Sequence, residues 1–588
     1  MALKACNERT GSLGLRRQMH MRKLRGVGAS PGLVVGPAFL FQQEDLRYEI
    51  TQVSEPQAEW KRIEQAFQTA FDQLKLICDK ASAEVGESEA AIFEAHMQML
   101  QDPELIDSIR KSILDGHENA EKALMDAAEY YATALDQLSD EYLRARADDV
   151  RDVARRCLRI LLGKPQVDAA LSKPSIILAR DLSPSDTVQM EKTMVLGFCT
   201  AEGGATSHTA ILAKALGVPA VVGVGYGLLD SVEGSSLMIN GRTGEVTLDP
   251  DEATVSAFMQ SQKAEEERAA ADLLAAIKPA MTRDGHTVEV VANVGSVDDA
   301  EKAVTSGAEG IGLLRTEFLY LNRQVAPTEE EQFTVYKKIF DTQGSRPIVI
   351  RTLDVGGDKE LPYIDLGNED NPFLGWRAIR MCLDNPDFFK TQLRSILRAA
   401  VGHDVRIMFP MIASVKEVIR ARELLEQARA ELQSADQALE VKVQVGIMVE
   451  IPSAAVMADK FIEVVDFFSI GTNDLTQYTL AVERTNKKVA HLSNGLDPAV
   501  LRLIAKVIEE GHKGGVWVGM CGELAGEPRA IPVLIGLGLD EFSMAPSLIP
   551  HAKAVIRRSD SADCKRIARK VLDLPTYDEV DAYLSRLA

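Results

Sequence analysis

The chain has 588 residues, of which 46% are hydrophobic and 26% charged, and its 66 basic and 87 acidic side chains give a net charge of −21 at pH 7. At roughly 150 residues per domain, this length predicts about three or four domains, and the acidic balance argues against nucleic acid, whose phosphates need a basic surface. The seven cysteines lack CxxC spacing and no apolar run reaches the ~20 residues of a membrane span, so we expect a cytoplasmic protein without membrane insertion, disulfide framework or zinc site.

The N-terminal quarter begins with a basic segment and continues into helical sequence. Residues 1–22 contain no apolar segment of the kind that a secretory signal needs, so we expect a disordered extension or, given Met19 and Met21, a start codon assigned too early. From 53 to 163 apolar residues recur every three or four positions, which predicts helices near 60–77, 91–100, 107–114, 120–138 and 141–162. Strand-like sequence resumes after this stretch, so we interpret 53–163 as an all-α helical subdomain inserted into another domain.

Short β-rich segments surround the helical insertion. They lie at 33–41, 175–179, 194–199, 219–224 and 236–248, and the last contains Asn240-Gly241, a strong hairpin signal. We therefore expect a small α/β domain built from residues 23–52 and 164–250.

The segment Gly203 to Ala210 reads Gly-Gly-Ala-Thr-Ser-His-Thr-Ala and leads into a short amphipathic helix that ends at Gly217. His208 is thus expected near a helix N-terminus, where unpaired backbone N–H groups and the helix dipole favour an anion. An imidazole in that place suits a carrier of a phosphoryl group. From the local sequence alone, a histidine that caps a helix in a tight turn is the alternative.

The C-terminal half begins after a polar, Ala- and Glu-rich helix, which we assign to 251–280 as a linker. Within 281–588, helical stretches separate eight strand candidates, at 287–293, 308–314, 347–353, 405–411, 444–451, 465–471, 516–520 and 540–544. Eight β-then-α units in about 300 residues predict a TIM (β/α)8 barrel. A doubly wound sheet is the alternative.

Polar residues follow several of these apolar runs, at the end where a TIM barrel places its active site. Arg315 and Arg351 offer forked donors for phosphate or carboxylate. Glu450 and Asp474 are hard oxygen ligands on neighbouring strands, the arrangement that Mg²⁺ takes when it also holds substrate phosphate. Salt bridges that cap barrel strands are the alternative interpretation of each residue alone.

Cys521 follows the seventh run among polar groups, where a thiol can act as proton donor or nucleophile. The alternative is a small buried hydrophobic residue, the commoner role of a lone cysteine. Taken together, the strand ends predict a small phosphorylated carboxylic acid and Mg²⁺ in the barrel mouth.

Several long motifs in this order closely resemble Enzyme I of the bacterial sugar phosphotransferase system, the phosphoenolpyruvate–protein phosphotransferase family. They are Gly-Gly-Ala-Thr-Ser-His-Thr (203–209), Leu-Leu-Arg-Thr-Glu-Phe-Leu-Tyr (313–320), Asn-Pro-Phe-Leu-Gly-Trp-Arg (371–377), Gly-Thr-Asn-Asp-Leu-Thr-Gln-Tyr (471–478) and Gly-Met-Cys-Gly-Glu-Leu-Ala-Gly (519–526). The resemblance extends from about residue 25 to the end of the chain.

The resemblance implies a role for each matching residue. His208 accepts a phosphoryl group from phosphoenolpyruvate on Nε2, and Cys521 protonates the enolate to give pyruvate. Glu450 and Asp474 hold Mg²⁺, while Arg315, Arg351 and Arg484 clamp the phosphate with Asn473 and Asp474 beside them. The helical insertion docks the phosphocarrier protein HPr, and the barrel forms a homodimer. Ala205 departs from the family, which usually has arginine there.

This resemblance predicts the first step of phosphotransferase-system sugar uptake, with a histidine domain that swings about hinges near 251–277 and 162–173. Pyruvate phosphate dikinase and phosphoenolpyruvate synthase are rivals, but they need an ATP-binding domain of ~200 residues or more. Only about 50 residues precede the helical insertion here, and no Gly-rich nucleotide loop is visible. A regulatory, nitrogen-related phosphotransferase and a catalytically inactive scaffold are the remaining alternatives.

Overall fold

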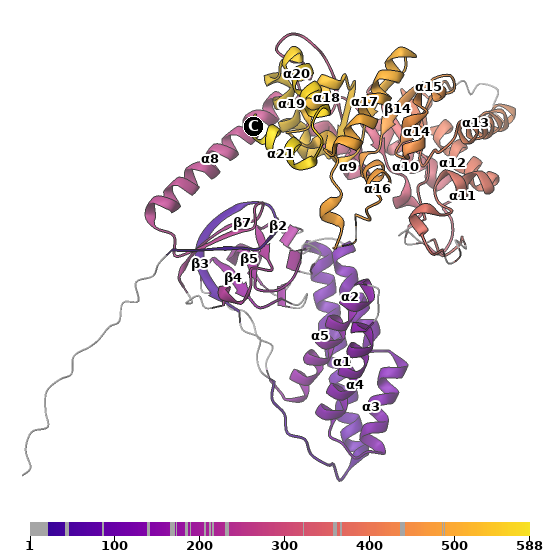
Figure 1. The fold of residues 1–588 in the computed structure, drawn as a ribbon. Coiled ribbons are helices and arrows are strands. Elements are labelled where there is room, and N and C mark those ends of the chain that lie inside the picture. The colour runs from indigo at the N-terminus through magenta and orange to yellow at the C-terminus, as the bar shows by residue number, and fades with distance from the viewer. Residues whose placement is uncertain are drawn as a thin grey trace, which may run out of the picture. The chain divides into compact units, whose positions relative to one another are not determined.

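The computed structural model (Figure 1) forms two compact units, Met1–Lys263 and Ala264–Ala588, each of which is described by itself. The structure describes residues 21–41, 46–84, 87–137, 141–164, 171, 173–182, 186–187, 190–204, 207, 209–210, 213–214, 217–229, 234–321, 323–356, 361–364, 367, 369–435, 441–484, 486 and 488–587. In this part of the chain, none of the helices is both long and apolar enough to cross a membrane.

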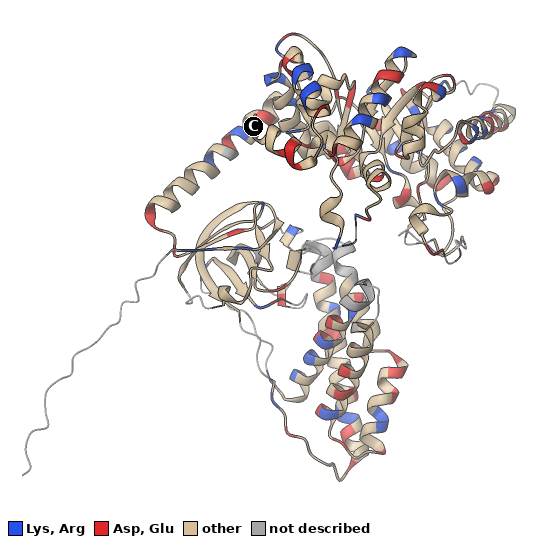
Figure 2. Ribbon diagram, in the orientation of Figure 1, with Lys and Arg blue, Asp and Glu red and all other residues tan. Residues whose placement is uncertain are grey.

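The helical stretch predicted in the first unit is confirmed. Its helices are α1 (Pro56–Glu84), α2 (Glu87–Met99), α3 (Pro103–Leu114), α4 (Ala120–Asp136) and α5 (Glu141–Leu161). Helix α3 begins four residues earlier than predicted, because the Asp102 side chain accepts the backbone N–H groups of Glu104 and Leu105. Charged residues of both signs lie along these helices (Figure 2), while Ile63, Leu74 and Phe93 lie in the core between them.

The α/β part of the first unit is an eight-stranded sheet in the order β1-β8-β7-β3-β4-β5-β6-β2. Its strands are β1 (Arg22–Arg25), β2 (Val27–Ser30), β3 (Leu33–Leu40), β4 (Ser175–Ala179), β5 (Val195–Thr200), β6 (Ala220–Val222), β7 (Ser236–Asn240) and β8 (Glu245–Leu248). The predicted hairpin is confirmed, since β7 and β8 pair antiparallel and the Asn240 side chain accepts two turn N–H groups. Strands β1 and β2 were not predicted, and β1 begins at Arg22, inside the expected extension.

Helix α8 (Glu252–Ala275) corresponds to the predicted polar helix, and most of its side chains are exposed. Just after its last turn, the buried ammonium of Lys553 donates to the carbonyls of Ala276, Lys278 and Gly307, at 2.9, 3.2 and 2.8 Å. These bonds satisfy backbone acceptors that a helix end leaves unpaired and tie the segment after α8 to the second unit.

The second unit contains a closed eight-stranded barrel, so the TIM-barrel prediction is confirmed and the doubly wound alternative is wrong. Its parallel strands are β9 (Glu289–Val294), β10 (Ile311–Leu314), β11 (Ile348–Arg351), β12 (Val405–Phe409), β13 (Gln444–Val449), β14 (Phe467–Ile470), β15 (Trp517–Met520) and β16 (Glu541–Met544). The helices are α9 (Val297–Thr305), α10 (Glu329–Gln343), α11 (Ile379–Asp384), α12 (Pro386–Ala399), α13 (Val415–Ala435), α14 (Pro452–Val456), α15 (Ala458–Phe461), α16 (Thr472–Leu480), α17 (Pro498–Lys513), α18 (Ile531–Leu537), α19 (Ile549–Arg558), α20 (Ser561–Leu572) and α21 (Tyr577–Ser585).

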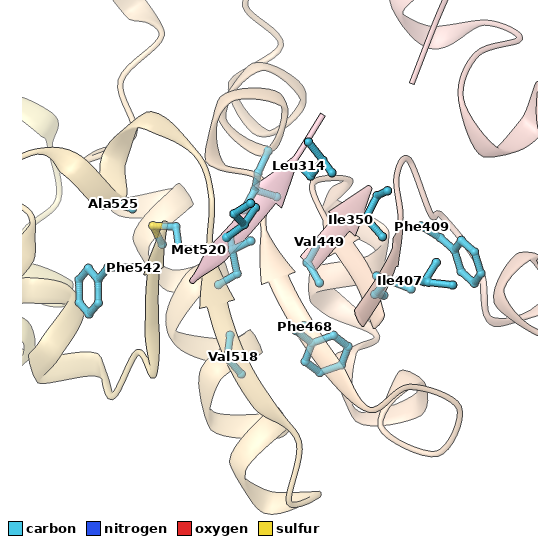
Figure 3. Packing of buried hydrophobic residues seen from close by; sticks show 14 of the residues in the cluster. Leu314, Ile350, Ile407, Phe409, Val449, Phe468, Val518, Met520, Ala525 and Phe542 are labelled. Atoms are coloured by element: carbon cyan, nitrogen blue, oxygen red, sulfur yellow. The ribbon is translucent and has the colours of Figure 1, made fainter. Parts of the chain in front are cut away.

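Side chains alternate between the two faces of the barrel strands, as the period of two requires. One set packs toward the surrounding helices and includes Leu314, Ile350, Phe468 and Phe542 (Figure 3). The other set forms a separate inner core of Leu313, Val349, Met408, Met448, Phe467 and Cys521. The inner core fills the barrel, so polar side chains that continue the inward set emerge at the two ends of the strands.

Candidate functional site

In the first unit, β5 leads into the glycine-rich segment that precedes His208. Gly203 has a φ of +96°, which favours glycine, and the Ser207 N–H donates to the Gly204 carbonyl at 3.0 Å. His208 and Ala205 themselves lie outside the described residues, so the expected place of His208 at a helix N-terminus stays a prediction. Thr209 and Ala210, which follow it, are buried.

A charged cluster lies at the start of the same segment. The Glu202 carboxylate accepts the Nε–H of Arg180 at 3.1 Å and the hydroxyl of Tyr226. The Arg180 side chain is 70% exposed, so this cation stays accessible to solvent beside the segment.

In the second unit, four of the predicted site residues gather at the carboxyl ends of the barrel strands. Arg351 ends β11, Glu450 follows β13, Asp474 lies in the first turn of α16 after β14, and Cys521 follows β15. All four are less than a tenth exposed. Buried charges of this kind persist only when they are paired, and the barrel mouth supplies the partners.

Arg351 is held between two carboxylates. Its guanidinium pairs with Glu317 and, at 3.0 Å, with Asp354. Burial alone would lower the pKa of this guanidinium, but the carboxylates of Glu317, Asp354 and Glu450 outweigh burial and raise it. Arg351 is therefore a permanent, oriented cation in a site largely closed to solvent.

Arg377 belongs to the same cluster, although the strand-end pattern did not single it out. Its Nη2 lies 2.9 Å from an Asp354 oxygen and 3.5 Å from an Asp474 oxygen. This arginine comes from the loop before α11 rather than from a strand, and only its membership in the motif at 371–377 pointed to it.

The remaining predicted residues lie around this buried cluster. Arg484 Nη1 is 3.5 Å from the second oxygen of Asp474. Asn473 is fixed by two hydrogen bonds to Glu523, one from its own amide to the Glu523 carboxylate and one from the Glu523 N–H, both 3.1 Å. Arg315 follows β10, where its backbone N–H donates to the Val294 carbonyl at 2.9 Å while the residue is exposed.

Glu450 is almost completely buried between these cations and two other carboxylates. Its carboxylate accepts the Met411 N–H at 2.6 Å. Burial raises the pKa of Glu450, and the nearby carboxylates of Asp474 and Asp354 raise it further, whereas Arg351 opposes them. A carboxyl group so placed gains from any cation that binds beside it.

The donor set fits a magnesium ion. Oxygen Oδ1 of Asp474 is buried and makes no hydrogen bond, although Arg484 Nη1 lies 3.5 Å away, and the Glu450 carboxylate comes from the neighbouring strand. Among the residues described, no group of three or more His, Cys, Asp or Glu side chains could hold a metal ion. Mg²⁺ often keeps only one or two protein carboxylates and takes its other ligands from phosphate and water, which agrees with this pair.

Cys521 lies among the inner side chains, next to the charged cluster. Burial raises the pKa of its thiol to about 11, although a hydrogen bond with Ser469 and the charge of Arg351 act in the opposite direction. The backbone carbonyl of Cys521 accepts the Asn293 amide at 3.0 Å, which fixes the segment at the end of β15. The thiol is thus protonated at neutral pH, as a proton donor must be.

Three stretches of the chain match known families. Residues 270–561 match the family described as PEP-utilising enzyme, PEP-binding domain, residues 25–146 match the N-terminal family of PEP-utilising enzymes, and residues 171–244 match their mobile domain.

Whole-length relatives agree with these matches. The phosphoenolpyruvate-protein phosphotransferase of Priestia megaterium is 45% identical over 560 residues, 95% of this chain and 98% of the relative. Its counterparts from Bacillus subtilis (strain 168) and Geobacillus stearothermophilus are 43% and 44% identical, cover 96% of this chain and are themselves covered to 99% and 98%.

Proposed function

This chain belongs to the phosphoenolpyruvate-protein phosphotransferase family of PEP-utilising enzymes, and we propose that it moves the phosphoryl group of phosphoenolpyruvate to His208 and then to the phosphocarrier protein HPr. The observation that carries this proposal is the buried cluster of Arg351, Glu450, Asp474 and Cys521 at one end of the barrel. It combines a cation for a phosphate, oxygen ligands for a metal and a protonated thiol. In the cell this reaction is the first step of sugar uptake by the phosphotransferase system.

Substrate binding follows from the charges at the barrel mouth. We propose that Arg315, Arg351 and Arg484 hold the phosphate, with Asn473 and Asp474 beside it, and that Glu450 and Asp474 hold Mg²⁺. A Mg²⁺ held by these two carboxylates would supply positive charge beside the phosphate and would help to neutralise the charge that develops during transfer. The arginines act in the same direction, and Arg351, which Glu317 and Asp354 already orient, needs little rearrangement when the charge develops.

Phosphoryl transfer to His208 precedes protonation of the enolate. The Nε2 of His208 forms a bond to phosphorus while the bond between phosphorus and the enol oxygen breaks, and the electron pair stays on the enolate of pyruvate. Cys521 then delivers its thiol proton to the terminal carbon of the enolate, which completes pyruvate. Solvent returns a proton to the thiolate, whose high pKa favours the neutral thiol.

The partners are also proposals. We infer that the helical subdomain at 53–163 docks HPr and that the barrel at 281–588 forms a homodimer, as the family resemblance implies. Exposed apolar side chains at Leu374, Val456, Met457 and Leu492, in the loops and short helices that follow barrel strands, support such an interface. A sedimentation experiment at micromolar concentration tests the dimer, and a single monomeric species would contradict it.

Labelled phosphoenolpyruvate tests the function directly. With Mg²⁺, the wild-type chain should acquire acid-labile label and pass it to purified HPr, while His208→Ala should acquire none. Absence of label on the wild type would contradict an enzyme and favour a scaffold. Label taken from ATP instead would favour a dikinase or synthase, and label that never reaches HPr but reaches a nitrogen-related carrier would favour the regulatory paralogue.

A further inference from the structure

We propose that Tyr478 is a positioning residue for the phosphoryl-transfer site, which it serves by fixing the guanidinium of Arg377 against Asp474. This inference rests on the function proposed above. Tyr478 lies on helix α16, whereas the site residues predicted from the sequence lie mostly at strand ends.

Tyr478 and Asp474 lie four residues apart on α16 and therefore share one face of that helix. Both contact the same guanidinium. Arg377 Nη1 donates to the Tyr478 hydroxyl at 3.4 Å, and Arg377 Nη2 lies 3.5 Å from Asp474. One helix face thus holds both ends of the arginine fork.

The Tyr478 hydroxyl also fixes the loop from which Arg377 comes. It donates to the carbonyl of Phe373 at 2.6 Å, and the Phe373 ring lies 5.9 Å from the Arg377 guanidinium carbon. Burial raises the pKa of Tyr478 to about 12, so its proton remains available for the Phe373 carbonyl. The hydroxyl therefore accepts from the arginine while it donates to the loop.

The Nη2 end of Arg377 is held by Asp354 at 2.9 Å, whereas Tyr478 is the partner of the Nη1 end. Its Nε is buried without a hydrogen-bond partner, and the next residue, Ala378, has a φ of +52°, a conformation that costs energy for a side chain with a Cβ. Three contacts hold the loop: the Trp376 N–H donates to Glu369 at 2.8 Å, Arg380 donates to the carbonyls of Leu374 and Gly375, both at 2.9 Å, and Tyr478 donates to the Phe373 carbonyl. Loss of the hydroxyl would leave the Phe373 carbonyl and one arm of the guanidinium without their partner.

A small displacement matters because transfer depends on aligned charges. Misplacement by about 1 Å costs roughly a hundredfold in rate in well-oriented sites. Removal of one hydroxyl loosens rather than removes Arg377, so Tyr478→Phe should slow phosphorylation of His208 at saturating phosphoenolpyruvate by about 5- to 20-fold. The KM for phosphoenolpyruvate should change by less than about twofold, since Arg351 and the other cations remain.

Tyr363→Phe is the matched control. The Tyr363 hydroxyl also donates to a backbone carbonyl, that of Tyr320 at 2.8 Å, in another loop of the same barrel, and among the described residues no guanidinium is hydrogen-bonded to it. This variant should keep the wild-type rate within about twofold, because it removes an equivalent bond away from the cluster. Equal losses of rate in both variants would overturn the proposal, since they would show a general effect of loop stability.

A double-mutant cycle shows whether Tyr478 acts through Arg377. Arg377→Lys keeps the charge but loses the planar fork, so it should slow transfer by itself. Adding Tyr478→Phe to Arg377→Lys should cause less than about a twofold further loss, because the contact is already gone. Independent, multiplying losses would refute the positioning role, and thermal midpoints of all variants identify any that simply unfold.

The same experiments separate the two proposals. If the wild-type chain takes no phosphoryl group from phosphoenolpyruvate, the proposed function fails and the role of Tyr478 fails with it. If the wild type is active and Tyr478→Phe keeps its full rate, the proposed function stands and the positioning role alone is wrong.

Discussion

The two ends of the barrel each hold a buried glutamate, and the two differ in surroundings. Glu450 lies at the carboxyl ends of the strands, where a backbone N–H of Met411 donates to it and Arg351 lies nearby. Glu541 lies at the amino end of β16, and neither of its carboxylate oxygens has a hydrogen-bond partner. Burial raises the pKa of both groups, that of Glu541 to about 8.

The contrast shows that a carboxyl group with a raised pKa does not by itself mark a functional site. Around Glu541 the inward side chains include the rings of Phe467 and Trp517, which stack with centroids 4.6 Å apart, and one cation, Arg406, which lies 4.8 Å from the Trp517 ring and opposes the rise in the pKa of Glu541. Around Glu450 they are arginines and carboxylates whose charges a ligand can exchange. We therefore expect chemistry at one end and only stability effects at the other.

The largest effect should come from Glu450→Gln. The amide keeps the shape of the side chain but removes a negative charge that we propose holds Mg²⁺, so phosphorylation of His208 should fall by about a thousandfold or more. The rate at which label passes from phosphoenolpyruvate to the protein measures this loss. Glu541→Gln is the matched control and should keep the wild-type rate, whereas a comparable loss in both variants would erase the distinction between the two ends.

The next largest effect should come from Arg351→Lys, which should lower kcat/KM by about a hundredfold. An ammonium cannot reproduce the fork that now contacts Glu317 and Asp354, and two buried carboxylates would be left poorly paired. Steady-state kinetics and a urea midpoint should therefore both report the change. Retention of full activity would indicate that Arg351 serves only to stabilise the barrel mouth.

Cys521→Ala should have a smaller effect, on a later step. It should slow protonation of the enolate by about 10- to 100-fold. Phosphorylation of His208 in a single turnover should persist, whereas formation of pyruvate and exchange of its methyl protons with solvent should slow, because the thiol proton is missing. Proton exchange followed by magnetic resonance distinguishes the steps. An unchanged exchange rate would favour the alternative of a small buried hydrophobic residue.

The smallest effect on activity, and a specific effect on stability, is expected from Glu541→Gln. In the folded chain Glu541 keeps its proton up to a pKa of about 8, while in the unfolded chain it loses the proton near the ordinary value. Its contribution to wild-type stability is therefore fully present below about pH 4.5 and is lost as the pH rises toward 8. The variant should match the wild type near pH 5 and exceed it at pH 8 by on the order of 2–4 kcal/mol in urea unfolding. A constant difference at both pH values would contradict the shift.

The strand ends were predictable because barrel strands are apolar runs that stop abruptly at a charge. Arg351, Glu450 and Asp474 all follow such runs and all lie in the cluster. Arg377 and Tyr478 were missed for a physical reason. One comes from an irregular loop and the other from a helix, where an aromatic side chain looks like ordinary core, and only the folded chain brings them together.

At the N-terminus the sequence pattern missed a strand that the structure contains. Strand β1 has the sequence Arg-Lys-Leu-Arg, which lacks the β-branched and aromatic residues that mark strands, and it forms because β8 offers an unpaired edge. The places of Ala205 and His208 fall outside the described residues, and their roles stay predictions from the sequence and the family.

The side chains of the inner core close the barrel along its axis. Phe467 lies so close to Gly446 that an added Cβ would meet its ring at 2.6 Å, and Leu313, Val349 and Met408 complete the filling. Small molecules thus have no passage along the barrel axis. Pyruvate must therefore leave at the carboxyl ends of the strands, where the next phosphoenolpyruvate also binds. Accumulated pyruvate should compete with incoming phosphoenolpyruvate, so that product inhibition by the keto acid would slow turnover.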